Sequence, residues 1–260
     1  MRKSHFIPAI PLLTGLLVSV AQAASPSVVE FSADVQQSGP QGAQSVGRVY
    51  VANAGMRTEM TQGGQQVIQI FDGKTQTTRM IFPAQKSYIE QQGAAGAPAA
   101  PAQEGSEVDP CRGVPGAKCH KLGSDTIGGR EAVKWEMTLE RQGKVLSSTQ
   151  WIDVERGFPL RQEMPNNQRM EQNFLGKEDL HGREVEKWEM KMMQVGQVPQ
   201  SSYRWFDPQL NMAIREEFPG GYVREMLNIR VGAQDPALFQ VPAGFEKVTP
   251  QQLGRPAGKR

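Results

Sequence analysis

Two cysteines and a histidine lie close together in the sequence and are the first candidates for chemistry. His120 follows Cys119 directly, and Cys111 lies a short distance before them. In an oxidising compartment an even, closely spaced pair of cysteines predicts a disulfide between Cys111 and Cys119. A metal or haem site that includes His120 is the alternative. The spacing fits neither a Cys-x-x-Cys zinc pair nor a Cys-x-x-Cys-His haem attachment, so we expect no metal and no cofactor.

Other residue patterns give little support for catalysis. Outside the N-terminal leader the chain has two histidines, His120 and His181, and it lacks a Gly-x-Ser-x-Gly elbow and a His-Glu-x-x-His motif. General acid–base chemistry would have to rest on carboxylates alone, and most of these alternate onto exposed strand faces. We therefore expect no catalytic residue and no enzyme activity.

Methionine and tryptophan are the remaining candidates for a site. Met190, Met192 and Met193 lie close together, and methionine clusters can bind copper(I). Met190 and Met192 share a strand face with Trp188, however, so a core or an apolar ligand groove explains them without a metal. Thioethers suit surfaces that accept varied apolar partners, and we prefer this interpretation. The candidate groove residues are Trp135, Met137, Trp151, Trp188, Met190, Met192 and Trp205.

An internal repeat determines where these residues lie. The sequence Gly-Arg-Glu-Ala-Val-Lys-Trp-Glu-Met at 129–137 recurs as Gly-Arg-Glu-Val-Glu-Lys-Trp-Glu-Met at 182–190, and a Leu-Gly pair introduces each copy. Farther along, Trp-Ile-Asp at 151–153 corresponds to Trp-Phe-Asp at 205–207. We define repeat 1 as residues 122–174 and repeat 2 as residues 175–230. A fainter third copy of the second half lies near the N-terminus, around Arg57 and Glu59.

The repeats predict antiparallel strands. Apolar and polar residues alternate with a period of two from 133 to 140 and again from 187 to 192, and Gly, Pro and Asn separate the segments. We therefore predict a mainly β fold of repeated meanders, with short helices at most near 236–239 or 250–253. The Arg-x-Glu segments place both charges on one strand face, where they form structural ion pairs. The predicted pairs are Arg57 with Glu59, Arg161 with Glu163, and Arg215 with Glu217.

The first 23 residues have the pattern of a secretory signal peptide. Arg2 and Lys3 precede an apolar stretch, and an Ala-Gln-Ala cleavage site ends at Ala23. We predict cleavage there and a soluble periplasmic protein, because no later stretch approaches the roughly 18 apolar residues that span a bilayer. A retained N-terminal anchor is the alternative. Removing the two basic residues of the leader balances basic and acidic residues, which argues against nucleic acid as a partner.

The domain organisation follows from these segments. Residues 91–106 are rich in Ala, Gly, Pro and Gln and predict a flexible linker or loop. The expected segments are a signal peptide at 1–23, N-terminal strands at 24–90, the linker at 91–106, a disulfide segment with both repeats at 107–250, and a basic tail at 251–260.

Four short motifs carry a family resemblance. They are the Arg-bearing run at 48–60, Phe-Asp-Gly-Lys at 71–74, Phe-Pro-Ala-Gln-Lys-Ser-Tyr at 82–88, and the closing segment at 235–245. Together they resemble the outer-membrane lipoprotein carrier-like superfamily of periplasmic proteins, in an uncharacterised branch.

The resemblance implies a curved sheet, or half-open β-barrel, whose concave face holds a lipid, an acyl chain or a lipoprotein. Carriers of that group usually cover this face with helices, and no such helix is evident in this sequence. The function expected from the resemblance is a binding protein or chaperone. The alternative is an interaction or sensor module that contacts another envelope protein and binds no small ligand.

Overall fold

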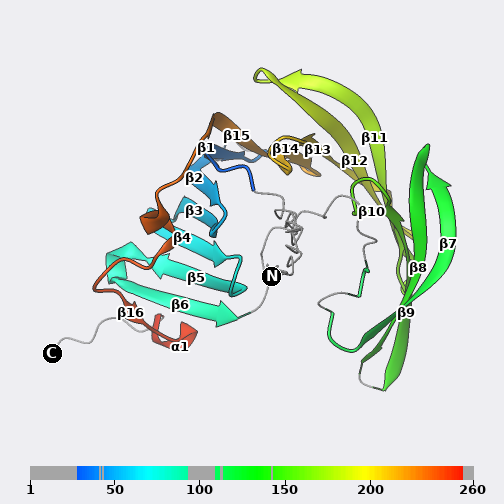
Figure 1. The fold of residues 1–260 in the computed structure, drawn as a ribbon, viewed down its shortest axis with the longest axis horizontal. Coiled ribbons are helices and arrows are strands. Elements are labelled where there is room, and N and C mark those ends of the chain that lie inside the picture. The colour runs from blue at the N-terminus through cyan, green and yellow to red at the C-terminus, as the bar shows by residue number, and fades with distance from the viewer. Residues whose placement is uncertain are drawn as a thin grey trace, which may run out of the picture.

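A single open sheet makes up almost the whole fold. The computed structural model describes residues 28–40, 42, 44–92, 109–111, 114–141 and 143–253. The strand order is β16-β6-β5-β4-β3-β2-β1-β15-β14-β13-β12-β11-β10-β9-β8-β7, and β16 and β7 are its two edges. The sheet bends into an arch, with the N-terminal strands on one side and β7–β10 on the other (Figure 1). The prediction of a mainly β, curved and half-open sheet is therefore confirmed.

The N-terminal strands form a meander of antiparallel pairs. Their bounds are β1 Phe31–Ser38, β2 Gln44–Ala52, β3 Gly55–Gln62, β4 Gln65–Asp72, β5 Thr77–Phe82 and β6 Ser87–Gln92, with the 3-10 helix η1 at Pro83–Gln85. Gly55 is at the β2–β3 turn with φ 145°, and a Cβ there would lie 1.9 Å from the Phe71 carbonyl oxygen. Only glycine therefore fits this close approach of two strands.

The repeats supply the strands of the other half. Their bounds are β7 Ala117–Ile127, β8 Arg130–Arg141, β9 Lys144–Asp153, β10 Pro159–Glu163, β11 Gln168–Leu180, β12 Arg183–Gln194, β13 Gln200–Asp207, β14 Met212–Phe218 and β15 Tyr222–Val231. The Leu-Gly pairs that introduce each repeat coincide with matching irregularities. The β7–β8 register shifts between Lys121 and Gly123, and the β11–β12 register shifts between Phe174 and Gly176. Both glycines have positive φ, which accounts for the residue type at these bulges.

The chain after β15 returns along the N-terminal strands. It contains the 3-10 helix η2 (Pro236–Phe239), the short strand β16 (Glu246–Lys247) and helix α1 (Pro250–Leu253). This segment runs from β15 past β4 to the edge at β6 (Figure 1). β16 pairs with β6 in parallel, so the sheet is mixed rather than purely antiparallel. The two short helices lie at the two positions that the sequence indicates.

Three clusters of buried side chains join neighbouring parts of the sheet. The first cluster joins repeat 1 to repeat 2 and consists of Ile127, Ala132, Trp151, Leu160 and Trp188. The second joins repeat 2 to β1 and β2 and consists of Val185, Trp205, Leu210, Ile214, Met226, Phe31, Ala33, Val35, Val49 and Val51. The third joins β4 and β5 to η2 and consists of Ala52, Ile68, Ile70, Ile81 and Phe239. The core is thus a series of contacts along the arch.

Several predicted boundaries need adjustment. Residues 91 and 92 belong to β6, so the described part of the expected linker begins as strand. The basic tail was expected from 251, but 251–253 lie in α1. The signal peptide at 1–23, residues 93–106 of the linker, and residues 254–260 lie outside the described residues. No described helix is long and apolar enough to cross a bilayer.

Candidate functional site

Trp151 and Trp205 occupy matching positions in two rows of side chains across the sheet. The register aligns Lys134, Trp151 and Arg161 on β8, β9 and β10. The Lys134 ammonium lies 4.9 Å from the centre of the Trp151 ring, and the Arg161 guanidinium lies 5.4 Å from it. The indole Nε1 donates a hydrogen bond to Asp125. Trp151 is therefore enclosed by two cations and a carboxylate.

The second row repeats these contacts around Trp205. The register aligns Lys187, Trp205 and Arg215 on β12, β13 and β14. Lys187 and Arg215 lie 4.6 and 5.2 Å from the ring centre, and the indole donates to Glu178. Both tryptophans are 5 % exposed. A cation over an indole ring is attractive because the ring face carries partial negative charge, so these residues stabilise one another.

A buried aspartate is the last residue of both β9 and β13, the two strands that carry Trp151 and Trp205. Asp153 accepts hydrogen bonds of 2.8 Å from the backbone N–H groups of Glu155 and Arg156, and it pairs with Arg130. Asp207 is bound in the same manner by the following turn and by Arg183. In each repeat the arginine of the Gly-Arg segment thus pairs with the buried aspartate of the Trp-x-Asp segment. Burial makes both partners necessary.

A third row crosses the N-terminal strands. Arg57, Ile70, Arg79 and Glu90 are aligned on β3, β4, β5 and β6, so Ile70 takes the place of the tryptophan. Arg79 Nε donates to Glu90 at 2.8 Å, as Arg161 donates to Glu171 at 3.1 Å. In the register Arg79 therefore corresponds to Arg161 of repeat 1. Arg57, which the faint third copy in the sequence indicated, does not take this position.

The Arg-x-Glu segments do not all pair within one strand. Arg57 lies 2.7 Å from Glu59, and Arg215 lies 2.6 Å from Glu217. Arg161 instead donates across the strands to Glu171, and Glu163 is exposed. The expected partner of Arg161 is corrected because β10 ends at Glu163, whereas Glu171 is directly opposite Arg161 in the register.

By the strand register Trp188 points to the face opposite Trp151 and Trp205, although Trp188 and Trp151 belong to the same buried cluster at the junction of the repeats. It follows Lys187, which is aligned with Trp205, and successive side chains of a strand point to opposite faces. Phe158 packs edge-on against Trp188 with a centroid distance of 5.1 Å, and the Arg130 guanidinium lies 5.4 Å from the ring centre. Trp188 is 1 % exposed. The end of repeat 1 thus covers this residue of repeat 2.

Trp135 is the residue of repeat 1 that corresponds to Trp188 of repeat 2, but its surroundings differ. It is only partly buried, and its indole Nε1 has no hydrogen-bond partner among the described residues. Trp188 donates its indole N–H to Glu186 at 3.3 Å, and Val133 stands at the equivalent position in repeat 1. The repeat alignment alone could have located this difference, because the two nine-residue segments differ at this position.

The seven candidate groove residues are therefore divided between two faces. Trp151 and Trp205 share one face with the cations that enclose them. The register places five residues on the other face: Trp135, Met137, Trp188, Met190 and Met192. Of these, Trp188 is covered, Trp135, Met137 and Met190 are partly buried, and Met192 is 37 % exposed. Met170 lies opposite Met192 on β11. Gln150 and Gln162 lie between Trp135 and Met170 in the same row, so the apolar side chains form two groups on this face, which we call the Trp–Met face.

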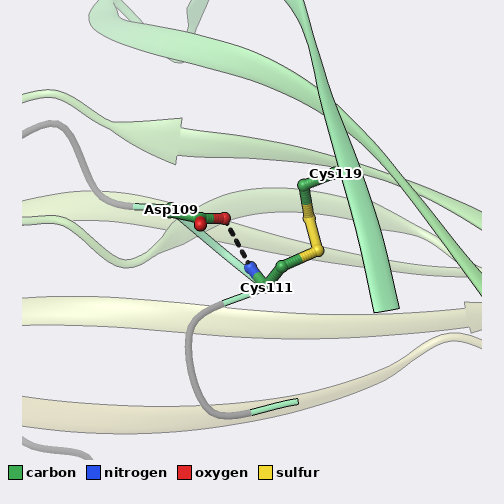
Figure 2. Close-up of side chains that lie close together, drawn as sticks. All are labelled: Asp109, Cys111 and Cys119. Carbon is green, nitrogen blue, oxygen red and sulfur yellow. Dashed lines mark hydrogen bonds between the residues drawn. A yellow bond between two sulfur atoms is a disulfide. The ribbon is translucent and has the colours of Figure 1, made fainter. Parts of the chain in front are cut away.

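The disulfide lies at the end of the same face. Cys111 is bonded to Cys119, which is paired with Met137 in the β7–β8 register, and the predicted disulfide is confirmed. Asp109 accepts a hydrogen bond of 2.8 Å from the backbone N–H of Cys111 (Figure 2). Asp109, Cys111 and Cys119 are close enough to hold a metal ion together. The two sulfur atoms are bonded to each other, however, and cysteine binds a metal ion as a free thiolate.

Arg204 is a partly buried arginine at the junction of the repeats. Arg204 lies over the Phe158 ring at 5.0 Å and donates to Gln172. Desolvation lowers the pKa of Arg204 below its ordinary value, against the opposing effect of Glu216. A guanidinium stays charged at physiological pH, so Arg204 provides a fixed positive charge beside Trp188.

A small pocket lies elsewhere, beside η2. It has a volume of about 100 Å³ and is lined by Ala54, Ile70, Phe71, Asp72, Lys74 and Phe239. It is far along the sheet from the Trp–Met face, because β4 belongs to the other side of the arch. None of the seven candidate groove residues lines this pocket.

Comparison with known proteins finds similarity to solved structures only. No family model and no curated protein matches the chain. It is similar to the solved structure of a DUF1329 family protein from Desulfovibrio piger, at 13 % identity over 83 % of this chain and 91 % of that one, with a TM-score of 0.37.

Two further solved structures bear names of the group that the sequence resembles. A LolA superfamily protein from Nitrosomonas europaea is 12 % identical over 82 % of this chain and 90 % of that one, with a TM-score of 0.34. A putative outer membrane lipoprotein-sorting protein domain from Vibrio parahaemolyticus is 11 % identical over 82 % and 91 %, with a TM-score of 0.35. These TM-scores lie below 0.5, so the function proposed below rests on the geometry of this chain.

Proposed function

We propose that the protein is a periplasmic binding protein that holds a lipid, an acyl chain or a lipidated segment on the Trp–Met face. The leader sequence supports export, and the disulfide fits an oxidising compartment. The proposal assigns no catalytic residue. The ion pairs around Trp151 and Trp205 serve structure, because each charged group there already has a partner within the fold.

The observation that carries the proposal is the partial exposure of apolar side chains on one face. Met170 and Met192 are directly opposite each other, and Met190 is next to Met192 on the same face of β12. Met137 and Trp135 are on the same face of β8. Unbranched thioethers adapt their shape, so such a surface accepts flexible alkyl chains without a fixed complementary form. Burying such side chains under a ligand is favourable by about 25 cal/mol per Å².

Two of the original candidates are excluded from this surface. Trp151 and Trp205 are enclosed on the opposite face by Lys134, Arg161, Lys187 and Arg215. A ligand could reach their rings only by displacing these cations. The proposed site therefore consists of Trp135, Met137, Met170, Met190 and Met192.

The test is a titration of the mature protein with a fluorescent fatty acid whose emission rises in an apolar environment. Met192→Glu places a charge on the Trp–Met face and should weaken binding at least tenfold. Met193→Glu is the matched control, because Met193 is the next residue on β12 and is aligned with Arg169 on the opposite face. The control should bind like the unchanged protein.

Equal affinity of the two variants, or no binding by the unchanged protein, would refute the acyl site. The second candidate function is an interaction module that contacts another envelope protein without a small ligand. The indole N–H of Trp135 has no acceptor among the residues that the structure describes, and this favours the second candidate, because a buried donor is costly until an acceptor is supplied.

A further inference from the structure

Arg204 is a cation on the Trp–Met face that has no carboxylate partner among the described residues. Its Nη2 donates to the neutral Oε1 of Gln172, and its guanidinium lies 5.0 Å from the centre of the Phe158 ring. Glu216 is directly opposite Arg204 in the register, but its carboxylate pairs with Arg224 at 2.7 Å. A partly buried charge without a counter-ion is costly, so this position favours an anion from outside the fold.

The strand register fixes where this charge lies. Arg204 on β13 is paired with Trp188 on β12. Gln172 on β11 is paired with Met190 on β12. The hydrogen bond that joins Arg204 to Gln172 therefore crosses β12 on the Trp–Met face, next to Met190. The charge thus lies beside the apolar group of repeat 2.

One nitrogen of the Arg204 guanidinium is open to a ligand. Nη2 is bonded to Gln172, whose own amide donates a 2.7 Å hydrogen bond to the carbonyl oxygen of Pro159. Nε is enclosed and has no acceptor among the described residues. Nη1 is neither bonded to a described residue nor enclosed, so it can donate to an incoming oxygen. Burial lowers the pKa of Arg204, against the effect of Glu216, as expected for a cation that lacks a bound counter-ion.

Repeat 1 has no charge at the corresponding position. The two Trp-x-Asp segments align Gln150 with Arg204. Gln150 is buried and is paired with Trp135, as Arg204 is paired with the tryptophan of its own repeat. The sheet thus accepts a neutral amide at this position, and the repeat architecture does not require an arginine. The charge distinguishes the two apolar groups of the Trp–Met face.

We propose that the ligand of the Trp–Met face is a free fatty acid and that Arg204 binds its carboxylate. The acyl chain lies along the methionine group of repeat 2, which consists of Met170, Met190 and Met192. This inference rests on the proposed acyl site and names the chemical class of its ligand.

A carboxylate fits this position better than other headgroups. One cation matches one negative charge, and Glu216 in the same row opposes a second, which disfavours a phosphate. An esterified acyl chain, as in a lipidated protein, has no charge to offer Arg204. The position therefore selects a singly charged amphiphile.

The experiment compares two probes on the mature protein at neutral pH: a dansyl-labelled undecanoic acid and its methyl ester. The probes have the same chain and differ in charge. We expect the acid to bind at least tenfold more tightly than the ester. Arg204→Gln, which introduces the residue type that repeat 1 has, should abolish this preference and leave the affinity for the ester unchanged. Arg204→Lys keeps the charge and should retain a preference for the acid.

Arg169→Gln is the matched control. It removes the same charge from β11, and Arg169 pairs there with Glu171 on the opposite face from Met170. This variant should keep the full preference for the acid. Unlabelled palmitate should displace the acid probe, and stronger displacement by a lysophosphatidic acid would overturn the choice of a carboxylate.

The outcomes separate this inference from the acyl site on which it rests. Equal affinities of the unchanged protein for the acid and the ester would overturn the role of Arg204 and leave the acyl site standing, whether or not the variants fold. An undiminished preference in folded Arg204→Gln would overturn that role as well. Binding of neither probe would refute the acyl site itself.

Discussion

The indole N–H of Trp151 donates to Asp125 Oδ2 at 2.8 Å, and this bond joins β9 to β7 across the intervening strand β8. Trp205 makes the equivalent bond to Glu178, which joins β13 to β11. In each repeat the tryptophan thus connects strands that have no backbone hydrogen bonds to each other. This hydrogen bond between non-adjacent strands explains why a tryptophan occupies the same position in both repeats of this chain.

Removing the Trp151 side chain should destabilise the protein without affecting ligand binding. Trp151→Ala leaves a cavity in the first cluster and should cost about 3–5 kcal/mol of unfolding free energy, measured by urea denaturation. Trp151→Phe keeps an aromatic ring and should cost less. If a folded Trp151→Phe protein lost fatty-acid binding while Met192→Glu did not, the assignment of the two faces would be wrong.

Asp207 should be among the most sensitive polar residues. Asp207→Asn leaves Arg183 without its charged partner in a buried position, and breaking such a pair costs about 3–5 kcal/mol. Equilibrium unfolding in urea measures this loss. Glu184→Gln is the comparison, because Glu184 is exposed and its partner Lys177 is exposed too. A loss of similar size in both variants would contradict the role given to burial.

Loss of the disulfide should weaken the fold moderately. The bond closes a short ring between Cys111 and Cys119, and loop entropy predicts a stabilisation of about 2–3 kcal/mol. Cys111→Ser with Cys119→Ser should lower the unfolding free energy by this amount, and a reducing agent should do the same to the unchanged protein. An unfolding curve that reducing agent leaves unchanged would show that the bond contributes little.

Stability should fall in acid through Glu225. Burial raises the pKa of Glu225, but hydrogen bonds and charge from His181 and Arg215 outweigh it and hold the pKa below its ordinary value of 4.5. A carboxyl with a lowered folded-state pKa stabilises the fold above its unfolded pKa. This contribution is lost as the pH falls through 4.5 and then through the folded pKa.

The measurement is the unfolding free energy in urea as a function of pH for the unchanged protein and for Glu225→Gln. The variant should be less stable at neutral pH and should show a smaller decrease below pH 4.5. Other carboxyls with lowered pKa values, such as Glu90 and Glu189, leave a residual slope in both proteins. Parallel curves for the two proteins would contradict the assignment.

Local sequence patterns were sufficient to predict the strands of this fold. Alternation with a period of two in β8 and β12, and Gly-rich turns between strands, depend only on neighbouring residues. The disulfide followed from spacing and compartment. The parallel pairing of β16 with β6 could not be predicted, because it depends on where the chain after β15 returns.

The candidate site was only partly predictable for a related reason. Alternation within β12 correctly puts Met190 and Met192 on the face of Trp188. It cannot relate Trp188 to Trp205, since their relative orientation is set by the register between β12 and β13. The partner of Arg161 depended on register as well, because Glu171 and Glu163 are both near it in the sequence and only one is directly opposite.

The clusters that join successive parts of the sheet have a consequence for how the fold responds to local damage. Each cluster is formed by one part of the sheet and the next, and no cluster spans the whole arch. Damage to one cluster should therefore act first on the two parts of the sheet that it joins, as the loss of one interface does in a repeat array. The strands near the edge β7 and those near the edge β16 can thus lose their packing separately.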